Sequence, residues 1–252
     1  MSDFSLEEFK KASLEVLDAI VKFCDERGIG YFLNYGTLLG AIRHKGYIPW
    51  DDDIDIGMLR PDYDKFVQAF TESPLNYDFI NGDALEEHGL LMGNINNAKA
   101  HFAGIDIFCI DNAPDNELAL KIMLIRYSFY RKLFAAKRSP INRKYKGRPL
   151  YIKIFGKLAS IAVRLIPLPM SYFKRKVWQT ARMYNHENTR RVGCFQMLKA
   201  VVIDRELIAN TIYAEFEGKQ YKIPAGYDEW LRKNYGDYMK LPPKHMQVPK
   251  HH

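Results

Sequence analysis

The chain has 252 residues, of which 47% are hydrophobic and 27% are charged. This balance is typical of a globular protein with one sizeable core, and it excludes a collagenous or disordered chain. The three cysteines are scattered and form no paired motif, so we expect no disulfide framework and a reducing, cytoplasmic location.

The net charge of +7 conceals a segregation of charge along the chain. Residues 121–182, here called the basic block, contain 17 Lys and Arg and no Asp or Glu; the rest of the chain has 20 basic and 30 acidic residues. The basic block is too aliphatic for the mixture of basic and aromatic side chains that binds nucleic acid. Nucleic acid is therefore not the expected partner.

The first part of the chain predicts alternating helices and strands. Ser5 and Glu8 have the spacing of a capping box, and a helix is expected from there to a stop at Gly28. Apolar residues alternate with polar residues or Gly over 54–58, the pattern of a half-buried strand. The remaining elements of this part are strands over 31–33, 77–80 and 105–110 and helices over 38–43 and 61–70.

The basic block has the character of long helices. Within 151–166, polar side chains recur in one narrow stripe on an otherwise apolar helix, at Lys153, Lys157, Ser160 and Arg164. Pro167 and Pro169 end this helix. The segment 201–238 returns to mixed character.

Four aspartates lie within five residues, at positions 51–53 and 55. Carboxylates this close repel one another and raise one another's pKa unless a cation neutralises them. On a strand, Asp53 and Asp55 share a face and lie about 7 Å apart, so both can bind one Mg²⁺ or Mn²⁺ ion. Asp106 repeats the pattern on another predicted strand and is the expected third ligand, with Asp111 as a weaker one. A solvated acidic turn or a structural Ca²⁺ loop is the alternative explanation.

A phosphate-binding turn is predicted just before the acids. The turn at Gly36 and Thr37 opens a short helix, whose free N–H groups and a hydroxyl can hold a phosphate. Arg43, His44 and Lys45 follow and can supply positive charge to a leaving phosphate. Trp50 is expected in the core rather than as a stacking platform.

These residues carry a family resemblance. The string GTLLGAIRHKGYIPWDDDIDIGM over 36–58 is similar to the LicD family, as are the segments 60–66, 216–218, 223–224 and 235–243. The resemblance implies an α/β (α+β) nucleotidyltransferase-like fold, with a small mixed sheet, flanking helices and a basic helical insertion. It implies a catalytic core over 1–118, a basic helical subdomain over 119–190 and a C-terminal segment, 191–252, that packs back on the core.

The resemblance also implies an activity. LicD-type enzymes transfer phosphocholine to bacterial surface glycans such as teichoic acid, capsule or lipopolysaccharide, and they are related to fukutin-type ribitol-phosphate transferases. The implied donor is a CDP-alcohol, usually CDP-choline, and the acceptor is a glycan or lipid-linked glycan. Asp53, Asp55 and Asp106 fall on the catalytic metal-binding positions. A carboxylate, Asp106 or Asp111, would accept the proton of the attacking hydroxyl, and Glu217 and Asp237 would shape a substrate pocket.

Alternatives remain open for the function and for the basic block. The chain could be a nucleotidyltransferase acting on a small molecule or RNA, or a non-enzymatic nucleic-acid-binding module. We expect the basic block to bind the anionic inner face of the cell membrane peripherally. The other interpretation of the block is a core helical subdomain with a solvated basic rim.

Overall fold

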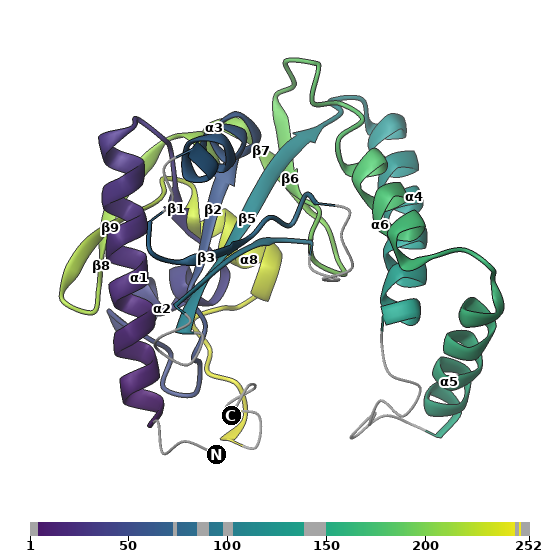
Figure 1. Ribbon diagram of the computed structural model, residues 1–252, viewed down its shortest axis with the longest axis horizontal. Coiled ribbons are helices and arrows are strands. Elements are labelled where there is room, and N and C mark those ends of the chain that lie inside the picture. Colours follow the sequence, from purple (N-terminus) through teal and green to yellow (C-terminus); the bar gives the residue numbers. More distant parts are fainter. Residues whose placement is uncertain are drawn as a thin grey trace.

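The fold is built on a mixed β-sheet, seen in a computed structural model that describes residues 5–72, 75–84, 91–97, 103–138, 150–244 and 247 (Figure 1). Within these residues, the strand order is β1-β2-β5-β4-β3, and the far end of β5 pairs with β6, which pairs with β7. The pair β2–β5 is parallel and the other pairs are antiparallel, which confirms the predicted mixed sheet. The strands are β1 (Phe32–Leu33), β2 (Asp55–Leu59), β3 (Asp78–Ile80), β4 (Gly93–Asn97), β5 (Ala103–Ala113), β6 (Arg191–Cys194) and β7 (Val201–Asp204).

Helices and a separate hairpin surround the sheet. The helices are α1 (Leu6–Glu26), α2 (Tyr35–His44), α3 (Arg60–Glu72), α4 (Glu117–Arg138), α5 (Leu150–Leu165), α6 (Met170–Ala181), α7 (Arg205–Ala209) and α8 (Tyr227–Tyr235). The hairpin consists of β8 (Thr211–Phe216) and β9 (Lys219–Pro224). The α+β class expected from the sequence is therefore confirmed.

Local sequence signals explain where the first two helices begin. The capping box of α1 is present, since the Ser5 hydroxyl accepts the Glu8 N–H and the Glu8 carboxylate accepts the Ser5 N–H. Helix α2 begins at Tyr35, three residues earlier than expected, because the side chain of Asn34 caps it by accepting the Tyr35 N–H at 2.9 Å. Gly36 and Thr37 consequently lie in the first turn of α2 rather than in a turn before it.

The sheet and its surrounding helices enclose the main hydrophobic core. Ile54, Ile56 and Met58 are buried, as the alternation in the sequence predicted. The C-terminal part of the chain returns to this core through β6, β7 and α8, where Trp230 is fully buried. All three cysteines are buried and free, so the expectation of no disulfide framework is confirmed.

The basic block forms a helical unit beside the sheet. Figure 1 shows α4 and α6 side by side, with α5 beyond them, farthest from the sheet. A second hydrophobic cluster joins α4 to α6 through Met123, Tyr127, Phe134, Phe173 and Val177. Helix α5 occupies almost the predicted range, but it contributes no residue to the buried part of either cluster among the side chains described. The domain limits at 118 and 190 stay a prediction.

Candidate active site

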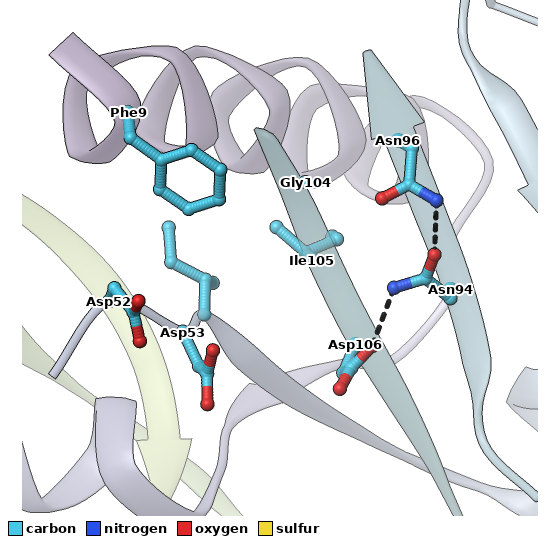
Figure 2. Close-up of a pocket in the computed structure, with 9 residues that line it drawn as sticks. Phe9, Asp52, Asp53, Asn94, Asn96, Gly104, Ile105 and Asp106 are labelled. Carbon is cyan, nitrogen blue, oxygen red and sulfur yellow. Dashed lines mark hydrogen bonds between the residues drawn. The ribbon is translucent and has the colours of Figure 1, made fainter. Parts of the chain in front are cut away.

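Two of the predicted metal ligands meet where β2 and β5 run side by side. Asp55 lies directly opposite Asp106 in the parallel register, so both side chains leave the sheet on the same face, with backbones about 4.8 Å apart. Asp53 precedes β2 by two residues and lines the same pocket as Asp106. Figure 2 shows Asp53 and Asp106 extending toward the same side of that pocket.

The acids of this cluster interact strongly with one another. Burial, followed by the charges of Asp106, Asp53 and Asp51, holds the pKa of Asp55 well above its usual range, although the Gly36 N–H partly opposes this shift. Among the described residues, one carboxylate oxygen from each of Asp51, Asp52 and Asp53 lies within 4.8 Å of the others, and Asp52 is only 1% exposed. Asp55 and Asp106 are not part of this close group but adjoin it through their charges, and the five aspartates together are here called the acidic cluster.

Two asparagines position Asp106. Asn94 pairs with Asp106 across β4 and β5, and its Nδ2 donates to Asp106 Oδ1 at 2.6 Å. The Asn96 amide in turn donates to Asn94 Oδ1, as Figure 2 shows. These asparagines line a pocket of about 190 Å³ together with Asp53 and Asp106. Sequence reasoning missed them, but the alternation of Asn with the buried Ile95 is the signal that could have found them.

The first turn of α2 holds the start of β2. The Thr37 hydroxyl accepts the Asp55 N–H at 2.8 Å, and the Gly36 N–H donates to Asp55 Oδ2 at 3.4 Å. A Cβ at position 36 would lie 2.6 Å from Asp51 Oδ2, so a larger residue here would displace the Asp51 carboxylate. Both predicted phosphate-binding residues therefore contact Asp55 of the acidic segment, and Thr37 is only 2% exposed.

A larger cavity of about 600 Å³ adjoins the acids. Gly36 and Asp51 lie at its boundary, and Arg43 and Lys240 bring positive charge to it. Its remaining walls come from α2, the following loop and the C-terminal segment: Leu39, Ile48, Trp50, Tyr235, Asp237, Tyr238, Leu241, Pro242 and Pro243. The cavity thus joins two segments that are about 190 residues apart in the sequence, near the acidic cluster.

Aromatic residues in this cavity differ from the sequence expectation. Trp50, expected in the core, is only partly buried and lines the cavity. Tyr235 lies close enough to the acids that burial and the charges of Asp55 and Asp51 raise the pKa of its hydroxyl. Asp237 lines the same cavity, in line with its expected place in a substrate pocket.

The other basic candidates lie at the far end of α2. Arg43 lines the larger cavity and donates to the Tyr238 carbonyl at 2.7 Å. His44 packs edge-on against Trp50, and burial and Arg43 lower its pKa. Lys45 is exposed, and its carbonyl accepts the Glu217 N–H. Neither His44 nor Lys45 lines the larger cavity as its walls are described.

Glu217 and Asp111 each hold segments of the fold together through their carboxylates. The Glu217 carboxylate accepts the Tyr47 N–H at 2.9 Å and fixes the hairpin to the loop after α2. Asp111 is fully buried on the opposite face of β5 from Asp106, where it accepts from Arg60 Nε at 2.7 Å and from Asn185 at 2.7 Å. The expectation that Asp111 is a metal ligand or general base is therefore wrong, because this carboxylate is committed to a buried ion pair.

The acidic cluster fits a hard divalent cation. Its donor set is made of carboxylate oxygens, the ligands that Mg²⁺ and Mn²⁺ prefer. Among the described residues, the main influences on Asp55 are burial, three neighbouring carboxylates and one backbone N–H, with no cationic side chain. A bound cation would relieve this repulsion, whereas a solvated acidic turn would need none of the support from Thr37 and Asn94.

The sequence is similar to a known protein family and to its members. Residues 28–139 match the family described as LicD/FKTN/FKRP, nucleotidyltransferase domain. The lipopolysaccharide cholinephosphotransferase LicD of Haemophilus influenzae is 30% identical over 262 aligned positions, which cover 100% of this chain and 97% of that protein.

Two further relatives match over shorter stretches. The ribitol-5-phosphate transferase FKTN of Mus musculus is 35% identical over 74 residues, which are 28% of this chain and 16% of that protein. The ribitol 5-phosphate transferase FKRP of Homo sapiens is 40% identical over 52 residues, covering 21% and 10%. With a relative that is 30% identical over almost its full length, the chain belongs to the LicD family of transferases.

Proposed function

We propose that this enzyme transfers a phosphorylated alcohol, in the first place phosphocholine, from a CDP-alcohol to a sugar hydroxyl of a bacterial surface-glycan precursor. This acceptor is a precursor of lipopolysaccharide, teichoic acid or capsule. The names of the relatives support the transferred group, since they act with choline phosphate or ribitol phosphate. The observation that carries the proposal is the acidic cluster beside a cavity large enough for a nucleotide.

Asp53, Asp55 and Asp106 are the proposed ligands of a Mg²⁺ or Mn²⁺ ion. When bound, such an ion neutralises negative charge on the donor diphosphate as CMP leaves. The role of the chain is to hold the three carboxylates in place. Thr37 fixes the backbone at Asp55, and Asn94 orients Asp106 through a short hydrogen bond.

The larger cavity is the proposed donor site. Arg43 and Lys240 would attract the diphosphate, while the ring of Trp50 offers an apolar surface to the cytosine base. Asp51 lies between this cavity and the other acids. We assign to its carboxylate the acceptance of the proton from the attacking sugar hydroxyl, since Asp111 is excluded by its burial.

A panel of donors tests this function. The enzyme is incubated with CDP-choline, CDP-ribitol, CDP-glycerol and CDP-ethanolamine, each with Mg²⁺ and a glycan acceptor, and CMP release is measured. CMP release and a phosphorylated glycan from one donor would support the proposal. The double variant Asp53→Asn/Asp55→Asn should abolish release, whereas the exposed aspartate variant Asp78→Asn on the same sheet should leave it unchanged.

The rival functions give different products. A nucleotidyltransferase would release diphosphate from a nucleoside triphosphate and leave the CDP-alcohols intact. That result, or CMP release that survives in Asp53→Asn/Asp55→Asn, would contradict the proposed function.

A further inference from the structure

Helix α4 exposes an apolar stripe to solvent. Leu118, Ile122, Ile125 and Phe129 are 66%, 58%, 71% and 58% exposed. Their spacing of four, three and four residues puts them on one face of the helix. The opposite face of α4 packs against α6, so this stripe is a second apolar surface that the core does not use.

Helix α5 exposes a wider apolar face. Large apolar side chains occupy most of its described surface, and Phe155 and Leu165 are 71% and 79% exposed. The full set is Leu150, Tyr151, Ile154, Phe155, Leu158, Ile161 and Leu165, here called the α5 apolar face. Lys157 and Arg164 lie along its edge, while the side chains of Lys153 and Ser160 lie outside the described part of the helix. Leaving this many apolar side chains in water is unfavourable, which indicates a partner.

Charge identifies the partner. Some cations of the basic block are used internally: Arg131, Lys137 and Lys174 donate to backbone carbonyls, and Arg182 pairs with Asp83. Others surround the apolar surfaces on exposed positions: Lys121, Arg126, Lys132, Arg138, Lys157 and Arg175. No acidic residue occurs anywhere in 121–182. An apolar face with described cations along its edge, in a segment without acidic residues, matches a layer whose surface is anionic and whose interior is hydrocarbon.

We propose that the α5 apolar face lies in the interface of an anionic lipid bilayer, with the exposed cations of α4, α5 and α6 on the lipid phosphates. No single described helix is long and apolar enough to cross a membrane. Helices α5 and α6 together have the length and composition for it, but a bend of 102° separates them. Helix α6 is committed to the protein core through Phe173, Val177 and Trp178. Helix α5 therefore lies along the bilayer surface, and the pair does not cross the bilayer.

Other occupants fit the same observations less well. A symmetric second copy would bring two basic blocks together, and like charges oppose that contact. RNA would find the cations, but only Tyr151 and Phe155 of the seven side chains of the α5 apolar face are aromatic and able to stack on bases. In Figure 1, α5 and the C-terminal tail, whose residues line the larger cavity, lie toward the same edge of the molecule.

Vesicle flotation of the full chain tests the proposal. The chain should float with vesicles of 30% phosphatidylglycerol at low salt, hardly with pure phosphatidylcholine, and less as NaCl rises. The variant Ile154→Ser/Phe155→Ser/Leu158→Ser should reduce the partition coefficient at least a hundredfold. The variant Arg126→Gln/Lys132→Gln/Lys157→Gln should reduce it by about fivefold for each charge removed.

A matched control and a probe make the test specific. Ile212→Ser/Tyr213→Ser removes two side chains of 45% and 64% exposure from the distant hairpin, and it should float like the unaltered chain. Because all three native cysteines are buried, Leu158→Cys can be labelled selectively with an environment-sensitive fluorophore. Its emission should shift to the blue on anionic vesicles, and the same label on Tyr213→Cys should not shift.

Three results would overturn the proposal: no flotation at low salt, equal flotation of the α5 serine variant, or no shift of the Leu158 probe on anionic vesicles. Self-association in the centrifuge, or a salt-dependent RNA shift, in a chain that does not float would assign this surface to another partner. CMP release with a water-soluble acceptor is measured in parallel. If the unaltered chain releases no CMP, the proposed function is contradicted, whereas flotation alone decides the membrane contact.

Discussion

The two aspartates of β5, Asp106 near its start and Asp111 near its end, are surrounded by different partners. At one end, Asp106 joins a cluster of carboxylates and is held by the neutral amide of Asn94. At the other end, Asp111 is fully buried but accepts from the Arg60 guanidinium. The comparison teaches that the partners supplied by other segments decide the surroundings of each aspartate: Arg60 fixes Asp111 in a buried ion pair, whereas Asn94 and Asp55 place Asp106 in the acidic cluster.

Removing the carboxylate at the acidic end should have the largest effect. In Asp106→Asn or Asp55→Asn we expect CMP release to fall at least about a thousandfold, which is about 4 kcal/mol of transition-state stabilisation. The reason is the loss of a ligand that helps to neutralise charge on the leaving group. Steady-state kinetics at saturating Mg²⁺ measures this, with circular dichroism to show that the fold is intact. Asp106→Asn with normal kcat would remove Asp106 from the site.

Removing the cation at the other end should act on stability. Arg60→Met leaves Asp111 buried with the neutral donors of Asn185 and Cys109 but without its cation, and we expect a loss of about 3 kcal/mol in the free energy of unfolding. Urea denaturation measures this loss. Adding Asp111→Asn to Arg60→Met should recover part of it, because the fully buried carboxylate is then replaced by a neutral amide, while Asp83 keeps its pair with Arg182 and Asp64 is exposed. A double variant as unstable as the sum of the single variants would show that the pair does not act as a unit.

The asparagine that orients Asp106 should have a smaller effect. Asn94→Ala removes the 2.6 Å hydrogen bond but leaves every carboxylate in the cluster. We expect activity at limiting Mg²⁺ to fall about tenfold, as for other groups that orient a metal ligand. High Mg²⁺ should restore much of the rate in Asn94→Ala but little in Asp106→Asn. Equal responses of the two variants to Mg²⁺ would contradict the positioning role.

The repulsion among the acids should appear in the stability of the metal-free enzyme. Because folding raises the pKa of Asp55, this group supports the fold below its unfolded pKa of about 3.9, and the support is lost as pH rises toward the folded pKa. At pH 7, Asp55→Asn should therefore be more stable than the unaltered chain in EDTA. Thermal unfolding with and without Mg²⁺ measures both effects. If Mg²⁺ raises the Tm of Asp55→Asn as much as it raises the Tm of the unaltered chain, Asp55 is not a ligand.

Part of the site could be predicted because it depends on neighbouring residues. The alternation around Ile54 and Ile56 put Asp53 and Asp55 on one face, and the same pattern identified Asp106. The role of Asn94 and the placement of Tyr235 could not be predicted in this way, because they depend on contacts between distant segments. Trp50 packs against the core as expected, but its second role as a wall of the cavity could not be predicted, since the facing wall comes from the C-terminal segment.

By itself, the sequence determined the mixed α+β character, the acidic cluster and the segregation of basic charge, because strand period, residue spacing and composition are local properties. Only the tertiary structure decided which aspartate of β5 has a cation beside it and which apolar helix face has no core to pack against. The physical reason is that neutralisation and burial depend on partners across the fold. Arg60 is 51 residues from Asp111, and the alternation of residues along one strand does not indicate such a partner.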